Sequence, residues 1–377
     1  MKTLFHFHWQ CSVEKYLKFV SFFILCFIRL EVTAGRNNCE VTKGSESFCT
    51  AITKMRAVRV SQFGGPEVLQ VLKDVKVPTP AGKEVLIKVK AAGINPVDTY
   101  IRSGNYARKP FLPYTPGGDG AGIVHEVGSD VSKFKAGDRV WFYGSLSGSY
   151  AEYSLSSESK LFSLPDAVDF DRGAAIGVPY LTAYRALFHK CHAKAGETVL
   201  IHGASGGVGI AASQLAVAAG LRVLGTVGSA EGKQILKENH VHEVFNHRLE
   251  GYVDEIMAAT SGNGVDIIIE MLANVNLGND LKMLAKNGRV GVIGSRGVVE
   301  VNPRDAMARE ASIHGVMLFN SSQKEIEESV AFITRGLTMN WFMPVVGRKY
   351  PLHEASLAHT DIIEGSAARG KVLLSME

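Results

Sequence analysis

The sequence predicts an α/β fold in two parts, a small β-rich domain followed by a domain with a doubly wound parallel sheet. Three observations predict this class. Short apolar alternations broken by Gly and Pro fill residues 55–140, and strand-like runs alternate with helical runs beyond residue 171. Residues 202–209 (HGASGGVG) form a glycine-rich turn between an apolar run and an Ala-rich helical run. Strands that alternate with helices of this length form a parallel sheet.

The β-rich part is predicted over residues 55–172. Three segments each have the pattern strand, turn, strand: MRAVRVSQFG, GKEVLIKVKAAGINP and GAGIVHEVGSDVSKFKAGDRVWFY. Gly and Pro separate the strands, as expected of a small barrel-like domain or sheet. The chain after residue 320 holds an amphipathic helix (KEIEESVAFITRGL) and a last strand (KVLLSM). We expect residues 320–377 to complete this first domain.

The parallel sheet is predicted within residues 173–319. A helix precedes it in GAAIGVPYLTAYRALFHKCH, where Ala174, Tyr180, Ala183 and Leu187 have the spacing of one helical face. Strands and helices then alternate in the order ETVLIH, IAASQLAVAAG, LRVLGT, EGKQILKEN, VDIIIEM, LGNDLKMLAKNG and RVGVIGS. This order predicts consecutive βαβ units, and hence a sheet with helices on both faces.

Composition and charge exclude several classes of protein. Hydrophobic residues make up 46% and charged residues 21% of the chain, which is typical of a globular protein and not of a disordered one. The 39 Gly have no period of three and no heptads recur, so collagen and coiled coils are excluded. The net charge of +4 falls to +1 beyond residue 54, where 34 Lys or Arg face 33 Asp or Glu. Such a charge does not require a nucleic-acid partner.

Residues 1–54 differ from the rest of the chain and are treated as an N-terminal extension. They carry four of the five cysteines and an apolar run at 19–28 (FVSFFILCFI), which is too short to span a bilayer. Three interpretations stay open: an extension translated from an upstream start with Met55 as the ordinary initiator, a secretory signal or anchor, and an organelle-targeting peptide. Cys191 is the single cysteine beyond residue 54, so a reducing, cytoplasmic compartment is expected and no membrane contact is predicted there.

The turn at 202–209 is predicted to bind the phosphates of a dinucleotide. Glycine is needed there for the tight turn, for the approach of backbone N–H groups to a pyrophosphate, and for close packing of the helix on its strand. The N-terminus of the following helix offers unpaired N–H groups and a partial positive charge to the phosphates.

The dinucleotide is predicted to be NADPH. An NAD site has an Asp or Glu at the end of the second strand, where it binds the ribose 2′-OH. Here Gly228 follows that strand, and the first carboxylate is Glu231 in the next helical run. Lys233, His247 and Arg248 lie in the following segments, and basic groups accommodate a 2′-phosphate. Solvated surface charge is the alternative interpretation, above all for Lys233.

Several long segments carry a family resemblance. They are INPVDTYIRSGNYARKPFLPYTPGGDGAG, GAAIGVPYLTAYRAL, HGASGGVG, EMLANVNL and VGVIGSRG. With them the chain resembles the zeta-crystallin family of quinone oxidoreductases, within the medium-chain dehydrogenase/reductase superfamily. The resemblance covers residues 55–377 and does not extend to residues 1–54. It implies a GroES-like β-barrel catalytic domain packed against a Rossmann domain, NADPH as the cofactor, and a homotetramer.

The chain departs from the zinc-dependent members of that superfamily. Asn95 stands where they have a Cys, and Gly118-Asp119 stands where they have His-Glu. Their lobe of four closely spaced cysteines has no counterpart in the sequence. Because a catalytic zinc needs about three protein ligands, we predict that the chain holds no metal.

The resemblance also implies the site residues. Asn95 and Tyr100 are the candidate catalytic residues, and the phenol of Tyr100 would orient the nicotinamide or donate to a carbonyl oxygen. Asp98 and Tyr106 lie in the same loop, where a role in packing or capping is an equally open interpretation. The implied NADPH contacts are Tyr100, Ser205, Gly206, Gly207, Val208, Gly228, His247, Asn276, Ile293, Gly294, Ser295, Arg296, Val316, Met317 and Leu318.

The predicted reaction transfers reducing equivalents from NADPH to a quinone, in one- or two-electron steps. Quinones accept hydride without a metal, so the protein has to supply position and hydrogen-bond donors for the forming oxyanion. Reduction of α,β-unsaturated carbonyls is the alternative, because it uses the same hydride and the same pocket. The resemblance further implies binding of AU-rich mRNA or a structural role in the lens, although the sequence shows no RNA-binding motif. Asn320 fits a glycosylation acceptor that would be inert in the cytoplasm, and Cys191 is predicted to be a structural thiol.

Overall fold

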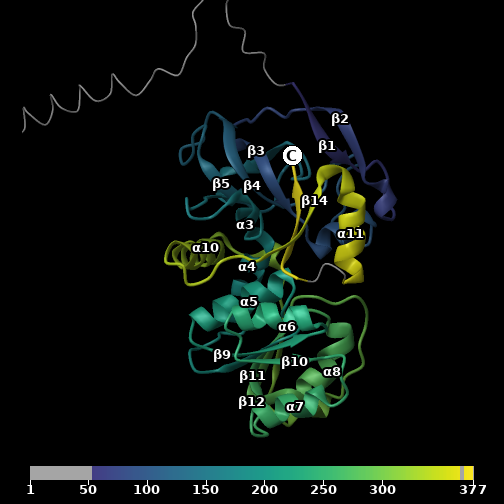
Figure 1. The fold of residues 1–377 in the computed structure, drawn as a ribbon, viewed down its shortest axis with the longest axis vertical. Helices are drawn as coiled ribbons and strands as arrows, with labels where there is room; N and C mark the ends of the chain where they lie inside the picture. Colours follow the sequence, from purple (N-terminus) through teal and green to yellow (C-terminus); the bar gives the residue numbers. More distant parts are fainter. Residues whose placement is uncertain (1–52, 366–368, 377) are drawn as a thin grey trace, which may run out of the picture. The chain divides into compact units, whose positions relative to one another are not determined.

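Two sheets contain most of the strands in the computed structural model, which describes residues 53–365 and 369–376 (Figure 1). The first described strand, β1, spans Lys54–Arg59. The predicted N-terminal extension, and with it the choice among its three interpretations, therefore lies outside the described residues except at its last two positions.

A seven-stranded sheet forms the β-rich part. Its strands lie in the order β14-β15-β3-β4-β5-β7, and β6 pairs with β3. The strands are β3 (Glu84–Gly93), β4 (Asp119–Val127), β5 (Arg139–Phe142), β6 (Tyr153–Ser157), β7 (Leu161–Ser163), β14 (Val346–Pro351) and β15 (Lys371–Ser375). β1 pairs separately with β2 (Gln70–Lys76) in an antiparallel ladder. Since β15 pairs antiparallel with β3, the end of the described chain lies in the same sheet as residues 84–93.

A six-stranded sheet confirms the predicted doubly wound class. All its neighbours are parallel, in the order β10-β9-β8-β11-β12-β13. The strands are β8 (Thr198–Ile201), β9 (Arg222–Val227), β10 (Glu243–Asn246), β11 (Val265–Glu270), β12 (Leu284–Val292) and β13 (Ser312–Gly315). Numbered within this sheet the order is 3-2-1-4-5-6, which is the Rossmann arrangement and places ligands at the carboxyl ends of the strands.

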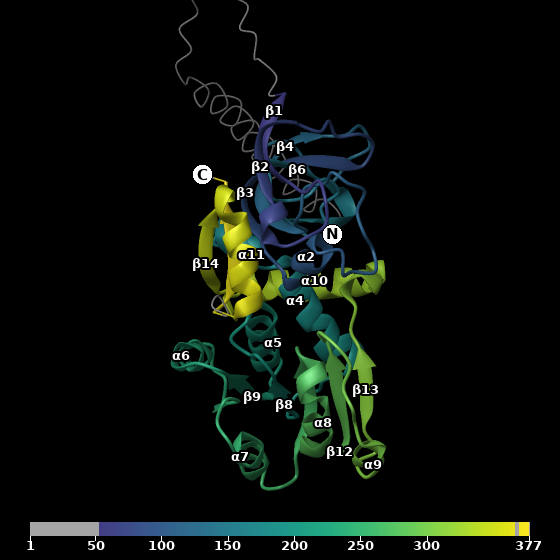
Figure 2. The ribbon, with the colours of Figure 1, turned by 90° about the vertical axis from the view of Figure 1, so that its right-hand side faces the viewer.

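Helices connect these strands and join the two sheets. They are α2 (Pro96–Arg102), α3 (Phe170–Ala174), α4 (Gly177–Tyr184), α5 (Gly207–Ala218), α6 (Ala230–Glu238), α7 (Tyr252–Ala259), α8 (Ala273–Met283), α9 (Pro303–Met307), α10 (Gln323–Thr338) and α11 (Ala355–Glu364). Short helical turns are η1 (Pro66–Val68), η2 (Glu158–Lys160), η3 (Arg185–Lys190), η4 (Leu318–Asn320) and η5 (Leu352–Glu354). Both views place α4 and α5 between the two sheets (Figures 1 and 2), and α4 contacts both α5 and β4.

One hydrophobic core continues from the β-rich part into the parallel sheet. It contains Trp141 of β5, Tyr180 of α4, Leu215 of α5 and Ile201 of β8, all at most 2% exposed. The predicted apolar helical face is buried in it, since Ala174, Tyr180, Ala183 and Leu187 all belong to the core. This shared core fixes the position of the glycine-rich turn relative to the β-rich sheet.

The structure differs from the sequence prediction in two places near the site. The segment after Asn95, expected as a loop, begins with helix α2, because Pro96 occupies the first turn and the Asp98 carboxylate accepts the Asn95 backbone N–H at 2.8 Å. The helix expected over 173–192 is divided into α3, α4 and the π-helical turn η3.

None of the helices in the described residues combines the length and apolar composition that a membrane crossing requires.

Candidate active site

The glycine-rich turn joins β8 to the N-terminus of α5. Gly203 has a φ of +55°, a conformation that L-residues with a side chain rarely adopt. A Cβ on Gly209 would lie 2.5 Å from the Gly203 carbonyl oxygen and 2.6 Å from the Ala204 Cα, so only glycine lets the helix approach this closely. Gly206 is the N-cap residue of α5, a helix of 12 residues. The geometry therefore fits a dinucleotide, whose pyrophosphate would lie at the N-terminus of α5.

The carboxyl end of β9 has basic side chains beside it and no carboxylate. A Cβ on Gly228 would lie 2.9 Å from Nε of Arg248 and 3.1 Å from Nε2 of His247. Burial lowers the pKa of His247, and the neighbouring Arg248 lowers it further. The nearest following carboxylate, Glu231, lies in α6, where it pairs with Arg369 at 3.7 Å. Positive charge at this end of the sheet suits an anionic group.

The other predicted cofactor residues lie at the same edge of the sheet. Ile293, Gly294, Ser295 and Arg296 follow β12, and Val316, Met317 and Leu318 follow β13. Asn276 is in α8, the helix that follows β11, and its side-chain amide donates to Glu270 at 3.2 Å. With Gly228 after β9 and His247 after β10, every predicted cofactor segment of the Rossmann sheet therefore lies at or just beyond the carboxyl end of a strand.

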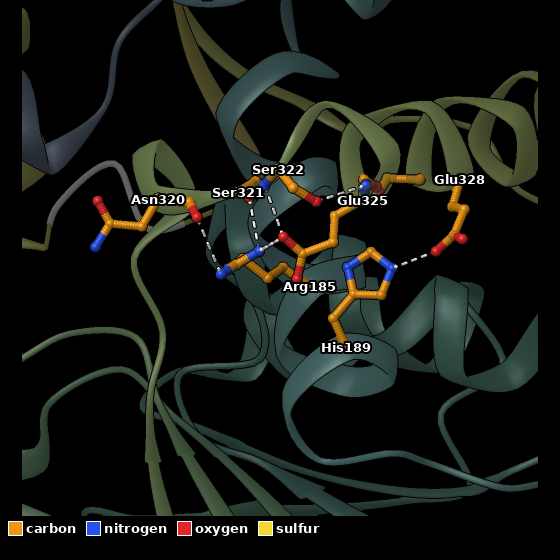
Figure 3. Close-up of polar contacts among 8 residues, drawn as sticks. Arg185, His189, Asn320, Ser321, Ser322, Glu325 and Glu328 are labelled. Carbon is orange, nitrogen blue, oxygen red and sulfur yellow. Dashed lines mark hydrogen bonds and ion pairs between the residues drawn. The ribbon is translucent and has the colours of Figure 1, made fainter.

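A buried arginine fixes the segment after β13 (Figure 3). Arg185 of η3 pairs with Glu325 of α10 at 2.6 Å, and its guanidinium also donates to the Ser321 hydroxyl at 2.9 Å. Burial alone would raise the pKa of Glu325, but hydrogen bonds from Ser322 and Arg185 lower it to about 2. Asn320, the potential glycosylation residue, is exposed and its backbone carbonyl accepts from Arg185 at 3.5 Å. Arg185 thus connects η3 both to α10 and to η4, the short helix that precedes α10.

His202, the buried first residue of the glycine-rich turn, lies beside two buried carboxylates. His202 Nε2 is 2.9 Å from Asp280 Oδ1 and 3.7 Å from Glu270 Oε2, and its Nδ1 is 3.2 Å from the Thr226 hydroxyl. Burial raises the pKa of Glu270 to about 7. Burial would lower the pKa of His202, but the hydrogen bond and charge of Asp280 raise it. The hydrogen bond between His202 and Asp280 joins the end of β8 to α8.

A cavity of about 600 Å³ lies beside α2. Its apolar lining includes Val97 and Ile101 of α2, Val178 of α4 and Phe319 of η4. Polar lining comes from Asn95, Asp98, Tyr114, Thr115, Ser145 and Ser147, and basic lining from Arg59, Arg108 and Lys109. This mixture of an apolar surface and a few polar groups is typical of a small-molecule site.

The structure brings only some of the predicted residues of the β-rich part to this cavity. Asn95 and Asp98 belong to its lining, whereas Tyr100 and Tyr106 do not. Tyr100 is half-buried on α2. The Tyr106 hydroxyl donates to the Met317 sulfur at 3.6 Å, which links the segment after α2 to the segment after β13. Whether Tyr100 reaches a bound nicotinamide stays a prediction.

A buried network continues from Asp98 away from the cavity. The Tyr150 hydroxyl lies 3.2 Å from Asp98 Oδ2 and 3.0 Å from His359 Nε2. Burial, with a smaller contribution from the nearby Asp119, raises the pKa of Asp98 to about 7. Burial and the nearby Arg102 lower the pKa of His359 to about 3. Near neutral pH this histidine is therefore uncharged, while Asp98 is close to its titration midpoint.

The buried side chains of Asn95, Asp119 and Lys371 contact one another. The Asn95 side-chain nitrogen donates to Asp119 Oδ2 at 2.9 Å, and its side-chain oxygen accepts from Lys371 Nζ at 2.5 Å. Lys371 also pairs with Asp119 at 2.9 Å, with side-chain exposures of 4% and 0%. The other Asp119 oxygen accepts the Val178 N–H at 2.9 Å. Sequence reasoning missed Lys371, because nothing in KVLLSM distinguishes this lysine from one that begins an ordinary strand.

These features define the class of the protein. Residues 81–166 match the alcohol dehydrogenase GroES-like domain, and residues 207–335 match the zinc-binding dehydrogenase family. A GroES-like domain joined to a Rossmann sheet with a glycine-rich turn makes the chain a medium-chain dehydrogenase/reductase, an oxidoreductase with a nicotinamide cofactor.

Individual relatives narrow the family. Human quinone oxidoreductase is 56% identical over 320 residues, which covers 85% of this chain and 97% of that relative. A mycobacterial protein solved in complex with NADPH is 31% identical, with a TM-score of 0.78 over 85% of this chain and 99% of the other. The quinone oxidoreductase of Pseudomonas syringae is 29% identical, with a TM-score of 0.78 and the same coverage. The chain belongs to the quinone oxidoreductase family.

Asn95, Asp119 and Lys371 do not fit the zinc that the second family's name implies. Zinc sites use thiolate, imidazole and carboxylate ligands. Here the corresponding positions provide the Asn95 amide and the Asp119 carboxylate, and the Lys371 ammonium lies within 2.9 Å of both. A positively charged ammonium in contact with the available oxygens opposes binding of a metal cation.

Proposed function

We propose that the protein transfers reducing equivalents from NADPH to quinones without a metal ion. The observation that carries this proposal is the carboxyl edge of the Rossmann sheet, where a glycine-rich turn lies on the N-terminus of α5 and basic side chains adjoin Gly228. Membership of the quinone oxidoreductase family supports the substrate class.

The phosphates of NADPH would be held at two places. The residues Ser205 to Val208, at the N-terminus of α5, would contact the pyrophosphate. Arg248 and His247 would meet the 2′-phosphate beside Gly228, where an NADH-specific enzyme would have a carboxylate. The segments at 293–296 and 316–318, with Asn276, would line the rest of the dinucleotide.

The β-rich part would hold the substrate. Val97, Ile101, Val178 and Phe319 give the cavity an apolar lining on which the flat ring of a quinone can pack. Bound NADPH would supply the hydride, and the product oxyanion would take its proton from solvent. Asn95 lines the cavity as a neutral hydrogen-bond donor for that oxygen, and Tyr100 would orient the nicotinamide.

A substrate panel tests this function. NADPH oxidation should be faster with small and ortho-quinones than with α,β-unsaturated carbonyls of similar size, in the presence and absence of a chelator. Faster turnover of the unsaturated carbonyls would mean that an enone is the preferred substrate, because the same cavity and the same Asn95 donor would bind an enone. No oxidation of NADPH with either class would refute the proposal.

The assembly, compartment and RNA role rest on the family resemblance. We propose a homotetramer in the cytoplasm, where the buried free thiol of Cys191 would stay reduced. Burial raises the pKa of this thiol to about 12, in keeping with a structural role. Binding of AU-rich mRNA and the lens role stay predictions, since no observation on the described residues favours them.

A further inference from the structure

Lys371 joins the cofactor side of the site to the substrate side. Its backbone begins β15, next to Gly370, whose N–H donates to the Ser205 carbonyl of the glycine-rich turn at 2.9 Å. A Cβ on Gly207 would lie 3.6 Å from the Lys371 Cδ, so the aliphatic stem passes close to this turn. The ammonium group ends between Asn95 and Asp119. Lys371 therefore runs from the predicted pyrophosphate site to the wall of the cavity.

The fold leaves room for this lysine. A Cβ on Gly93 would lie 2.7 Å from the Lys371 Cε and closer still to the Ala174 carbonyl oxygen. Any side chain at Gly93 would thus displace the lysine stem. Lys371 is 3% exposed, which is rare for a lysine and is explained here by its pairing with the fully buried Asp119.

The two charges determine how the Asn95 amide is oriented. An amide oxygen only accepts hydrogen bonds and an amide nitrogen only donates them. Lys371 donates to the oxygen and Asp119 accepts from the nitrogen. If the amide were flipped, its nitrogen would face the Lys371 ammonium and its oxygen would face the Asp119 carboxylate, so neither hydrogen bond could form. The Asn95 nitrogen has a second N–H, and Asn95 lines the cavity.

We infer that Lys371 is a positioning residue, which holds Asn95 so that its second amide N–H donates to the substrate carbonyl oxygen in the cavity. This inference rests on the proposed function. The ammonium also draws electron density toward the Asn95 oxygen, which strengthens the opposite N–H as a donor. Because Asp119 balances the lysine, the site orients a neutral donor without adding net charge to the cavity wall.

The experiment compares Lys371→Met with Lys349→Met. Lys349 lies on the adjacent strand β14 and pairs with Asp171 at 2.6 Å, so it controls for loss of a lysine–aspartate pair away from the cavity. We expect Lys371→Met to lower kcat for quinone reduction at least tenfold and to weaken binding of 1,4-naphthoquinone to the cofactor-free protein, measured by calorimetry. The dissociation constant for NADPH should change less than twofold. Lys349→Met should match the wild type in all three measurements.

A double variant separates positioning from simple charge balance. Lys371→Met/Asp119→Asn removes both buried charges, so its melting temperature should exceed that of Lys371→Met. The amide introduced at position 119 must keep its oxygen toward the Val178 N–H, which turns its nitrogen toward Asn95 and favours the flipped Asn95 amide. Turnover should therefore stay low although stability recovers. If Lys371→Met folds poorly, the double variant decides alone.

Three results would overturn the inference, and they differ in what they mean for the proposed function. Wild-type turnover and naphthoquinone affinity in Lys371→Met, or recovery of turnover in the double variant, would show that Lys371 only balances Asp119, and the proposed function would stand. A wild-type protein that neither binds naphthoquinone nor oxidises NADPH with quinones would refute the proposed function and this inference with it.

Discussion

Gly228 lies so close to Arg248 that a Cβ on the glycine would be 2.9 Å from the guanidinium Nε. An aspartate at position 228 would pair with that arginine and occupy the place proposed for the 2′-phosphate. We expect Gly228→Asp to weaken NADPH binding at least tenfold, about 1.4 kcal/mol, and to leave NADH binding equal or tighter. Fluorescence titration with both cofactors measures the change in preference.

The control for this change is Gly228→Asn, which adds the same volume without the charge. Gly228→Asn should weaken the binding of both cofactors alike, so NADPH should still bind more tightly than NADH. Thr226, the last residue but one of β9, is unsuitable for the same test, because it is buried and its hydroxyl contacts His202 and the Gly203 N–H. Equal affinity of the wild-type protein for NADPH and NADH would contradict the proposed cofactor choice.

Tyr100 offers a test of the predicted nicotinamide contact. If its hydroxyl makes a neutral hydrogen bond to cofactor or substrate, Tyr100→Phe should lower kcat roughly two- to tenfold, since such a bond contributes about 0.5–1.5 kcal/mol. Steady-state kinetics, with the melting temperature as the folding control, measures the loss. Tyr106→Phe, which removes only a weak donor to the Met317 sulfur, is the matched comparison. Unchanged turnover and NADPH affinity in Tyr100→Phe would remove Tyr100 from the site.

Much of the fold could be predicted because the buried strands have continuous apolar runs. β8, β9 and β11 lie at or next to the centre of the six-stranded sheet, and nearly all of their residues are buried. The strands that the sequence analysis missed include β10 and β13, which are the edges of that sheet. Their residues are mostly half-buried or exposed, so no apolar run marks them. Helix α2 was missed because a seven-residue helix is too short to show a periodicity.

The site could be predicted only where its residues share a local motif. The glycine-rich turn is contiguous, and its required glycines are visible in the sequence. The contact between Lys371 and Asn95 joins residues 276 positions apart, and the sequence carries no local trace of it. The same holds for His202 and Asp280, which are 78 positions apart. Buried charge pairs of this kind appear only when the topology brings distant elements together.

The proposal of a metal-free reaction predicts that zinc is absent from active protein. Because the Lys371 ammonium occupies the polar group formed by Asn95 and Asp119, elemental analysis should find far less than one zinc per chain. Incubation with EDTA should leave quinone reduction within about 10% of the untreated rate, whereas a zinc alcohol dehydrogenase treated in parallel should lose activity. Activity that is lost to EDTA and restored by added zinc would refute the metal-free mechanism.

The cluster of His202, Glu270 and Asp280 predicts how stability depends on pH. Burial raises the pKa of Glu270 from 4.5 to about 7, so between these values the folded protein binds a proton that the unfolded chain has released. The stability from this group is complete below pH 4.5 and is lost as pH rises through about 7. His202, whose pKa is also raised, acts in the same direction. The free energy of unfolding should therefore fall with pH across this window, by at most about 1.4 kcal/mol per pH unit for each proton.

The variant Glu270→Gln tests this origin, because a glutamine is always neutral and imitates the protonated acid in shape. In denaturant melts between pH 5.5 and 8.5, the free energy of unfolding should fall less steeply with pH for Glu270→Gln than for the wild type. The variant should therefore gain stability relative to the wild type at the alkaline end of this range. Glu197→Gln is the matched control. Burial would raise the pKa of Glu197, but hydrogen bonds from Arg289 and Lys194 lower it, so Glu197 stays ionised throughout this range. Its loss should cost the same stability at every pH. Parallel curves for the wild type and Glu270→Gln would mean that Glu270 is already ionised at pH 5.5, and the proposed protonation of the cluster would be wrong.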